Sequence, residues 1–122
     1  MKKIVLTVAI AFLVVSLGGI SAGKGQKQVA LAAPTSLKLV IVPNGFKLSW
    51  KPAAEVSGGA TGYEILRADM ASGPFTAVAK VDNGVFEYVD TTASREIIYY
   101  YKVRATAGNT YSSYSNTVTG ER

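Results

Sequence analysis

Few residues in this sequence could carry out catalysis. The chain contains no His and no Cys, which are the residues most used as general bases, thiolate nucleophiles and zinc ligands. Asp69, Asp82 and Asp90 lie in predicted turns, where Asp is favoured because its side chain bonds to the local backbone. Glu64 and Glu87 occupy strand positions that are predicted to face solvent, and no spacing forces two acids together to form a pair or to bind Ca²⁺. We therefore expect no catalytic residue, no cofactor and no metal site.

A row of aromatic and cationic side chains is a better candidate for a functional surface. Alternate residues of the β-favouring run 97–105 point to opposite sides of a sheet, so its Tyr, Lys and Arg at even positions face away from the core. Exposed rings flanked by cations can stack on sugar rings or anchor a protein partner. Alternatively, such cross-strand pairs only stabilise the sheet. The candidate ligand face consists of Leu66, Tyr100, Lys102, Arg104, Tyr111 and Tyr114.

The run 97–105 is the strand around which we expect the other elements to lie. It is the longest β-favouring segment outside the N-terminal region, and it contains neither Gly nor Pro. One face of this strand is apolar or aromatic, and the face that holds its even-numbered residues ends in two cations. The pattern therefore indicates a central strand with one buried side and one side near water. The residues predicted to enter the core are Ile97, Tyr99, Tyr101, Val103 and Ala105.

Six further strands are predicted from alternation and turn residues. The clearest is 45–51, in which the three large apolar residues from Phe46 to Trp50 point inward. In the strand before it, 36–42, every second residue from Leu37 to Ile41 is predicted to point inward. The remaining strands are predicted at residues 63–67, 75–81, 85–89 and 111–119. Short strands with frequent turn residues and no helical period predict an all-β fold, a seven-stranded antiparallel immunoglobulin-like β-sandwich.

The N-terminal segment has the pattern of a secretory signal peptide, predicted at residues 1–22. A short basic start is followed by an apolar run that a Gly pair ends. Cleavage is predicted after Ala22, with Ala32 as an alternative. The other possibility is a leader retained as an anchor, because its apolar run is at the short limit for a membrane span. Residues 23–33 are predicted to be a flexible linker, and residues 34–122 to form one domain.

Charge and cysteine content narrow the classes of partner. The whole chain has 13 Lys and Arg against 8 Asp and Glu, but the part from residue 34 onward has nine against eight. This near balance leaves no basic patch dense enough for nucleic acid. Without cysteines, the domain must be held by its apolar core alone. Lys38 and Lys47 are expected to protect sheet edges from pairing with a second copy, so we expect a monomer.

The sequence resembles the fibronectin type III family over residues 34–119, and its motifs are most similar to bacterial versions in secreted proteins. The segments that carry the resemblance are Lys47-Leu48-Ser49-Trp50, Gly62-Tyr63-Glu64-Ile65-Leu66-Arg67, Tyr88-Val89-Asp90, and the alternation of Tyr99, Tyr101, Val103 and Ala105 followed by Ser and Tyr residues. The resemblance implies a tyrosine corner, in which the Tyr99 hydroxyl bonds to the connection before its strand. The core residues expected from the pattern and the resemblance are Trp50, Tyr63, Ile65, Tyr99, Tyr101 and Val103.

Two features depart from the family pattern. Ala93 stands where many members have Leu, so we expect the connection to be longer or to be packed by Ile97 instead. The integrin-binding Arg-Gly-Asp sequence is absent, since the turn before the last strand contains Ala107-Gly108-Asn109.

The resemblance and the leader together imply a protein that acts outside the cell. We expect a secreted or extracytoplasmic chain, held at the cell surface if the leader is retained. Its expected role is that of a non-catalytic module for interaction with, or adhesion to, a protein or polysaccharide. The alternative is a structural spacer with no ligand of its own, as a fragment or subunit of a larger secreted assembly.

Overall fold

The computed structural model describes residues 31–52 and 59–122 of the chain. The predicted signal peptide, residues 1–22, and residues 23–30 of the predicted linker lie outside the described residues. Within the described ranges the protein consists of β-strands and loops, and no helix there could cross a membrane. The prediction of an all-β, antiparallel sandwich is confirmed.

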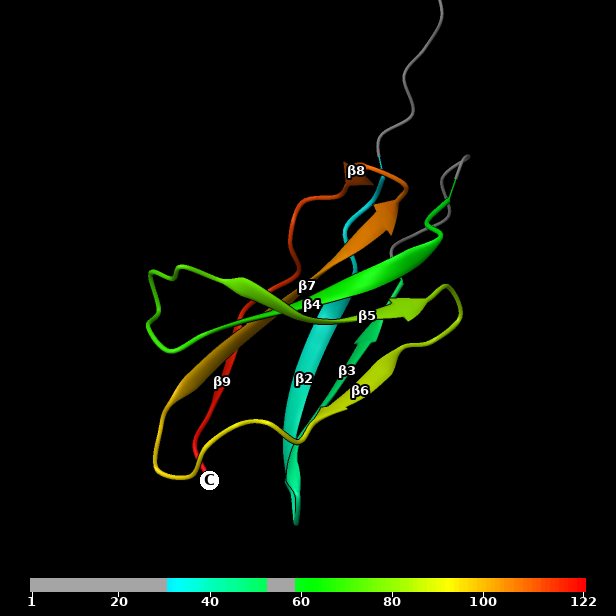
Figure 1. Cartoon of the computed structure of the whole chain (residues 1–122). Helices are drawn as coiled ribbons and strands as arrows, with labels where there is room; N and C mark the ends of the chain where they lie inside the picture. Colours follow the sequence, from blue (N-terminus) through cyan, green and yellow to red (C-terminus); the bar gives the residue numbers. More distant parts are fainter. Residues whose placement is uncertain (1–30, 53–58) are drawn as a thin grey trace, which may run out of the picture.

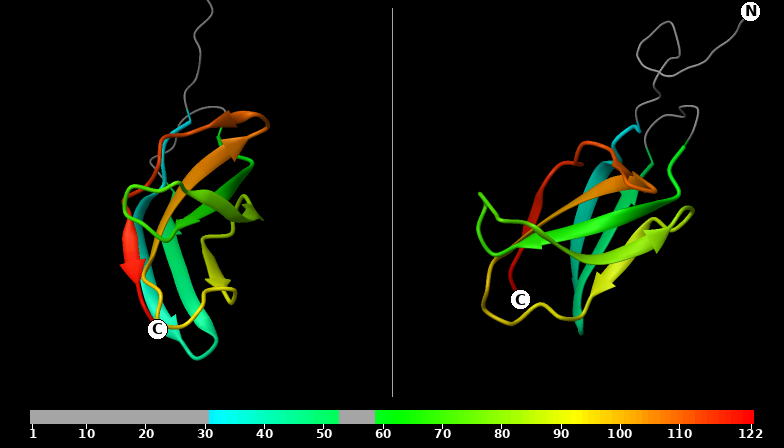
Figure 2. Two further views of the ribbon diagram at one scale, coloured as in Figure 1. Left: turned by 60° about the vertical axis from the view of Figure 1, so that its left-hand side comes forward. Right: turned by 45° about the horizontal axis from the view of Figure 1, so that its top comes forward.

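Two antiparallel sheets lie face to face (Figure 1). The smaller sheet contains, in spatial order, β2 (Thr35–Val42), β3 (Gly45–Lys51) and β6 (Glu87–Asp90). The larger sheet contains β5 (Thr76–Asp82), β4 (Gly62–Ala68), β7 (Tyr99–Ala107) and β8 (Thr110–Tyr111), with β9 (Val118–Gly120) also paired to β7. Figure 2 shows the two sheets from further directions, with β4 and β7 side by side in the larger one.

The strand β7 lies at the centre of the larger sheet, because it pairs with β4 on one edge and with β8 and β9 on the other. Its alternate residues enter the core, as the period of two requires. Across the sandwich, Phe46 of β3 packs edge-on against Tyr101, with ring centroids 5.8 Å apart. Trp50 and Tyr63 form a second edge-on pair at 5.7 Å. Edge-to-face aromatic pairs of this kind join the two sheets through buried area and favourable ring geometry.

Three residues depart from the predicted core pattern. Ile41 is 57% exposed, because it lies near the tip of the β2–β3 hairpin, which extends past the larger sheet (Figure 1). Ile97 is 40% exposed and precedes β7, because the chain turns at Arg95 and Glu96 before the strand begins. Ala93 is itself buried in the core, so the connection is not packed by Ile97. The predictions for Ile41 and Ile97 were wrong.

The last predicted strand, 111–119, is divided into β8 and β9, so the described residues contain eight strands rather than seven. Between them, the chain is attached to β7 partly through serine hydroxyls. The Ala105 amide donates to Ser112 Oγ at 2.8 Å, and the Val103 amide donates to Ser115 Oγ at 3.0 Å. Asn116 attaches the same segment to β2 by accepting from the Leu37 amide and donating to its carbonyl.

Candidate functional site

Five side chains form a continuous stack on the outer face of the larger sheet, where β4, β7 and β8 lie side by side. The Lys102 ammonium lies 4.1 Å from the ring centroid of Phe75 and 3.8 Å from that of Tyr114. The Arg104 guanidinium lies 3.8 Å from the ring of Tyr111 and 5.3 Å from that of Tyr114. Each cation therefore contacts two rings at distances typical of cation–π attraction. We call these five residues the cation–aromatic ladder.

The serine bonds described above position the two tyrosines of the ladder. In Tyr111-Ser112-Ser113-Tyr114-Ser115, residues three apart point the same way, which is the period of an extended left-handed chain rather than of a strand. Ser112 and Ser115 bond to β7, while Tyr111 and Tyr114 remain 43% and 41% exposed. The rings are thus fixed at one end and open to solvent.

A buried ion pair attaches the ladder to β4. Glu64 is 5% exposed, and its Oε1 accepts from Arg104 Nε at 2.7 Å and lies 2.6 Å from Arg104 Nη2. The two residues are direct cross-strand partners in the β4–β7 register. Arg104 Nη1 also donates to the Tyr114 hydroxyl at 3.3 Å. The prediction that Glu64 faces open solvent was wrong, because Glu64 is buried and its carboxylate pairs with Arg104.

The other members of the predicted ligand face have different positions. Leu66 is only 4% exposed, so its prediction as an exposed contact was wrong; it is the cross-strand neighbour of Lys102 in the β4–β7 register. Tyr100 is half-buried beside Ala68 and makes none of the ladder contacts. The structure therefore brings together Lys102, Arg104, Tyr111 and Tyr114 of the six predicted residues, and it adds Phe75.

Phe75 could not be identified from the sequence. It lies directly before β5, and the register between β4 and β5 shifts between Ile65 and Leu66. The extra residue of this bulge is Val78 on β5, and it changes the side on which the residues before it lie, Phe75 included. No local pattern at residue 75 indicates that its ring contacts Lys102, which is 27 positions later in the numbering.

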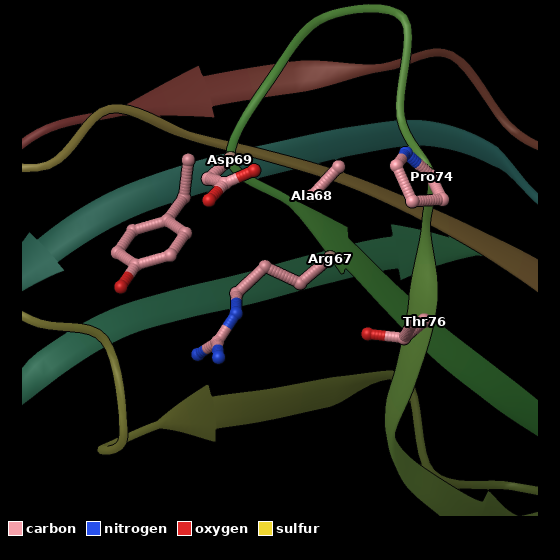
Figure 3. Close-up of a pocket in the computed structure, with 6 residues that line it drawn as sticks. Arg67, Ala68, Asp69, Pro74 and Thr76 are labelled. Carbon is pink, nitrogen blue, oxygen red and sulfur yellow. The ribbon is translucent and has the colours of Figure 1, made fainter.

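A second group of polar residues lies at one end of the sandwich, around a cavity of about 240 Å³ between β4, β5 and β7 (Figure 3). The residues that line it are Arg67, Ala68, Asp69, Pro74, Thr76 and Tyr99. The Arg67 guanidinium lies 4.6 Å from the centroid of the Tyr99 ring. Its Nη1 donates to Asp90 Oδ2 at 2.9 Å and to Thr92 Oγ1 at 2.9 Å.

Asp90 is the centre of this polar group. It is fully buried at the end of β6, where it accepts from the Tyr101 hydroxyl at 2.6 Å and from the Thr92 amide at 2.9 Å. Burial alone would raise the pKa of Asp90, but the hydrogen bonds from Thr92, Tyr101 and Arg67 outweigh it and hold that pKa below its ordinary value. Burial, together with the Asp90 carboxylate, raises the pKa of Tyr101.

These contacts make the Asp90 group a structural connection between the sheets. The carboxylate is ionised, and its charge is balanced by Arg67 on the opposite sheet. The prediction of a turn position explains only the Thr92 contact, since the other partners come from β4 and β7. In the part of the chain that the structure describes, no three acidic side chains approach closely enough to share a metal ion.

Known proteins resemble this chain in part of its sequence and in its fold. No protein-family model matches the chain. A 71-residue stretch, 58% of the chain, is 39% identical to part of the amylopullulanase of Thermoanaerobacter thermohydrosulfuricus, of which it covers 5%. A solved Fn3-like protein from Clostridium thermocellum superposes with a TM-score of 0.60 and 28% identity, over 72% of this chain and 88% of that one. The solved structure of the chicken CNTN1 FN1-FN3 domains superposes with a TM-score of 0.63 and 18% identity, over 77% of this chain and 32% of that one.

The chain has the fibronectin type III fold. In this fold the tyrosine corner is visible as a hydrogen bond from the Ser94 amide to the Tyr99 hydroxyl, at 3.2 Å. The partner is thus the backbone of the connection before β7, although the tyrosine oxygen accepts. The structure buries the six residues that the pattern and the resemblance together placed in the core, which are Trp50, Tyr63, Ile65, Tyr99, Tyr101 and Val103.

The fibronectin type III fold here corresponds to a small part of the curated relatives that it matches. The chain spans about 5% of the length of the amylopullulanases from Thermoanaerobacter thermohydrosulfuricus and Thermoanaerobacterium saccharolyticum.

Proposed function

We propose that this chain is a non-catalytic module that acts outside the cell, in association with proteins that degrade polysaccharides, and that it contacts polysaccharide through the cation–aromatic ladder. The resemblance to a short segment of amylopullulanases supports the polysaccharide context. The predicted leader supports export. The absence of His and Cys from the sequence supports a role in binding rather than catalysis.

The observation that carries this proposal is the fixed position of two half-exposed rings. Tyr111 and Tyr114 present large apolar areas to solvent, and their hydroxyls add polar contacts. Arg104 lies against both rings, and the serines beside them bond to β7. Because the two rings are already ordered in the free protein, binding a ligand on them costs little additional entropy of the tyrosine side chains.

A structural spacer is the second candidate, and the Arg104–Glu64 pair favours it. That pair neutralises one of the two ladder cations inside the protein. If the rings serve only to cover Leu66 and this ion pair, the ladder stabilises the outer face of the sheet and needs no ligand.

Retention of the full chain on immobilised polysaccharides separates the two candidates. We would use one neutral column, pullulan, and one acidic column, polygalacturonate. The proposal predicts retention on at least one column, and its loss in the double variant Tyr111→Ser/Tyr114→Ser. The control is Val40→Ser, which removes an apolar side chain of similar exposure, 57%, from the opposite sheet. A spacer passes through both columns, and a ligand-binding face elsewhere leaves the double variant retained.

A further inference from the structure

We propose that the polysaccharide bound by the ladder is acidic, with carboxylate groups that pair with Lys102 while its sugar rings contact Tyr111 and Tyr114. This inference rests on the proposed function and names the class of ligand for the same surface. It is argued from the charges on the outer face of the larger sheet and from the way in which Lys102 is held.

The outer face of the larger sheet carries an excess of positive charge. In the strand register, Lys80 of β5, Glu64 of β4 and Arg104 of β7 lie side by side. Lys102 lies two residues from Arg104 on the same side of β7. Asp82, two residues after Lys80 on the same side of β5, is exposed. These positions give three cations and two carboxylates, of which Glu64 is buried and bound to Arg104. Asp82 lies beside Lys80 on the far strand, so the cation that remains for a ligand on β7 is Lys102.

Lys102 is held in position without being neutralised. Among residues 31–52 and 59–122, no Asp or Glu oxygen lies within 4.0 Å of its ammonium, and its neighbours are the rings of Phe75 and Tyr114. A ring attracts a cation through its quadrupole and leaves the net charge unchanged. Lysine normally loses substantial rotamer entropy when it pairs with an anion. Here the rings already order the side chain, so an incoming carboxylate meets a positioned cation.

The arrangement fits an acidic polysaccharide better than an acidic peptide. A polyuronate carries both a ring and a carboxylate in each sugar unit, so one chain can cover a tyrosine ring and reach the neighbouring ammonium. An acidic peptide offers carboxylates on flexible side chains and no rigid ring to lie against Tyr111 or Tyr114. The alternation of rings and cations along the ladder therefore matches a ligand in which rings and charges also alternate.

The test is the affinity of the full chain for soluble polygalacturonate, measured by calorimetry beside pullulan and poly-glutamate. The proposal predicts preferential binding to polygalacturonate that weakens as salt is raised. Lys102→Gln is expected to weaken it about fivefold, the upper range for one exposed ion pair. Lys38→Gln is the matched control, because it removes the same charge from an exposed position on the opposite sheet. It should leave the affinity unchanged.

Four outcomes would overturn the inference. Equal loss in Lys102→Gln and Lys38→Gln would show a general effect of net charge. Equal binding of poly-glutamate would show that carboxylates alone are recognised. Binding of pullulan alone, lost in Tyr111→Ser/Tyr114→Ser, would reject the acidic ligand while leaving the proposed function intact, and binding of no polysaccharide would reject both.

Discussion

Replacing Asp90 with Ala should be one of the most damaging single changes in this domain. The carboxylate is fully buried and accepts hydrogen bonds from Arg67, Tyr101 and both the amide and hydroxyl of Thr92. It joins the end of β6 in the smaller sheet to β4 and β7 in the larger sheet. Its removal leaves the buried Tyr101 hydroxyl and a largely covered guanidinium without their anion.

The expected cost follows from the burial of each partner. Removing one member of a buried ion pair typically costs about 3–5 kcal/mol. The Arg67 side chain retains 23% exposure, so water can solvate part of its charge and the lower end of that range applies. We therefore expect Asp90→Ala to reduce the free energy of unfolding by about 3 kcal/mol, out of about 5–15 for a typical domain. For a domain of this size the midpoint of thermal unfolding should fall by about 12–24 °C.

Thermal and urea unfolding followed by circular dichroism would measure this loss, with Asp82→Ala as the control at the exposed end of β5. The control should change stability by less than about 0.5 kcal/mol. Adding Tyr101→Phe to Asp90→Ala should cost little more, because the hydroxyl has already lost its acceptor. A loss below about 1 kcal/mol, or strictly additive effects of the two substitutions, would refute the reasoning.

The same residue predicts a dependence of stability on pH. Because hydrogen bonds hold the pKa of Asp90 below its ordinary value in the folded state, the unfolded chain binds its proton first on acidification. The stabilisation is therefore complete above the unfolded pKa, near about 4, and is lost as pH falls from there through the folded pKa. Urea unfolding at a series of pH values should show a smaller acid loss in Asp90→Ala than in the unchanged chain; an identical loss would show that other carboxylates cause it.

Two further substitutions test the core. Tyr99→Phe removes the acceptor of the Ser94 amide but keeps the ring beside Arg67. Urea unfolding should therefore show that the free energy of unfolding falls by about 1 kcal/mol. An unchanged unfolding midpoint would exclude the tyrosine corner. Trp50→Ala removes a side chain that is 4% exposed and packs against Tyr63. The free energy of unfolding should therefore fall by about 3–5 kcal/mol. A fall of less than about 1 kcal/mol would show that the ring is not part of the core.

Much of the fold could be predicted because strand residues with a period of two have only one arrangement that buries their apolar face. In β3 the alternation of Phe46, Leu48 and Trp50 with polar residues is complete, and all three are buried. Ile41 shows the limit of this rule. Alternation indicates which side of a strand is apolar, but whether the facing sheet extends far enough to cover residue 41 depends on the lengths of other strands.

The ladder was only partly predictable, because its side chains come from segments that are distant from one another in the sequence. Leu66 and Glu64 lie on the outer face of β4 as alternation requires, yet both are buried. Their burial results from Lys102 and Arg104, whose positions depend in turn on the rings that contact them. A pattern within β4 alone carries no information about these long side chains.

One signal in the sequence was available and pointed to the division of the last strand. Tyr111-Ser112-Ser113-Tyr114-Ser115 repeats with a period of three, whereas a strand requires a period of two. The serine hydroxyls then replace part of the strand ladder by accepting from β7 amides. Asp90 had no such signal, because its partners on β4 and β7 are 23 and 11 residues away.

The most direct test of the central claim, that the ladder contacts polysaccharide, is a nuclear magnetic resonance titration of the full chain with polygalacturonate oligosaccharides and, separately, with pullulan oligosaccharides. The amide resonances should shift for residues on β7 and in the segment from Tyr111 to Ser115, while those of β2 and β3 stay in place. The aromatic resonances of Tyr111 and Tyr114 should shift as well. Shifts confined to the smaller sheet, or no shifts with either oligosaccharide at high concentration, would contradict the account.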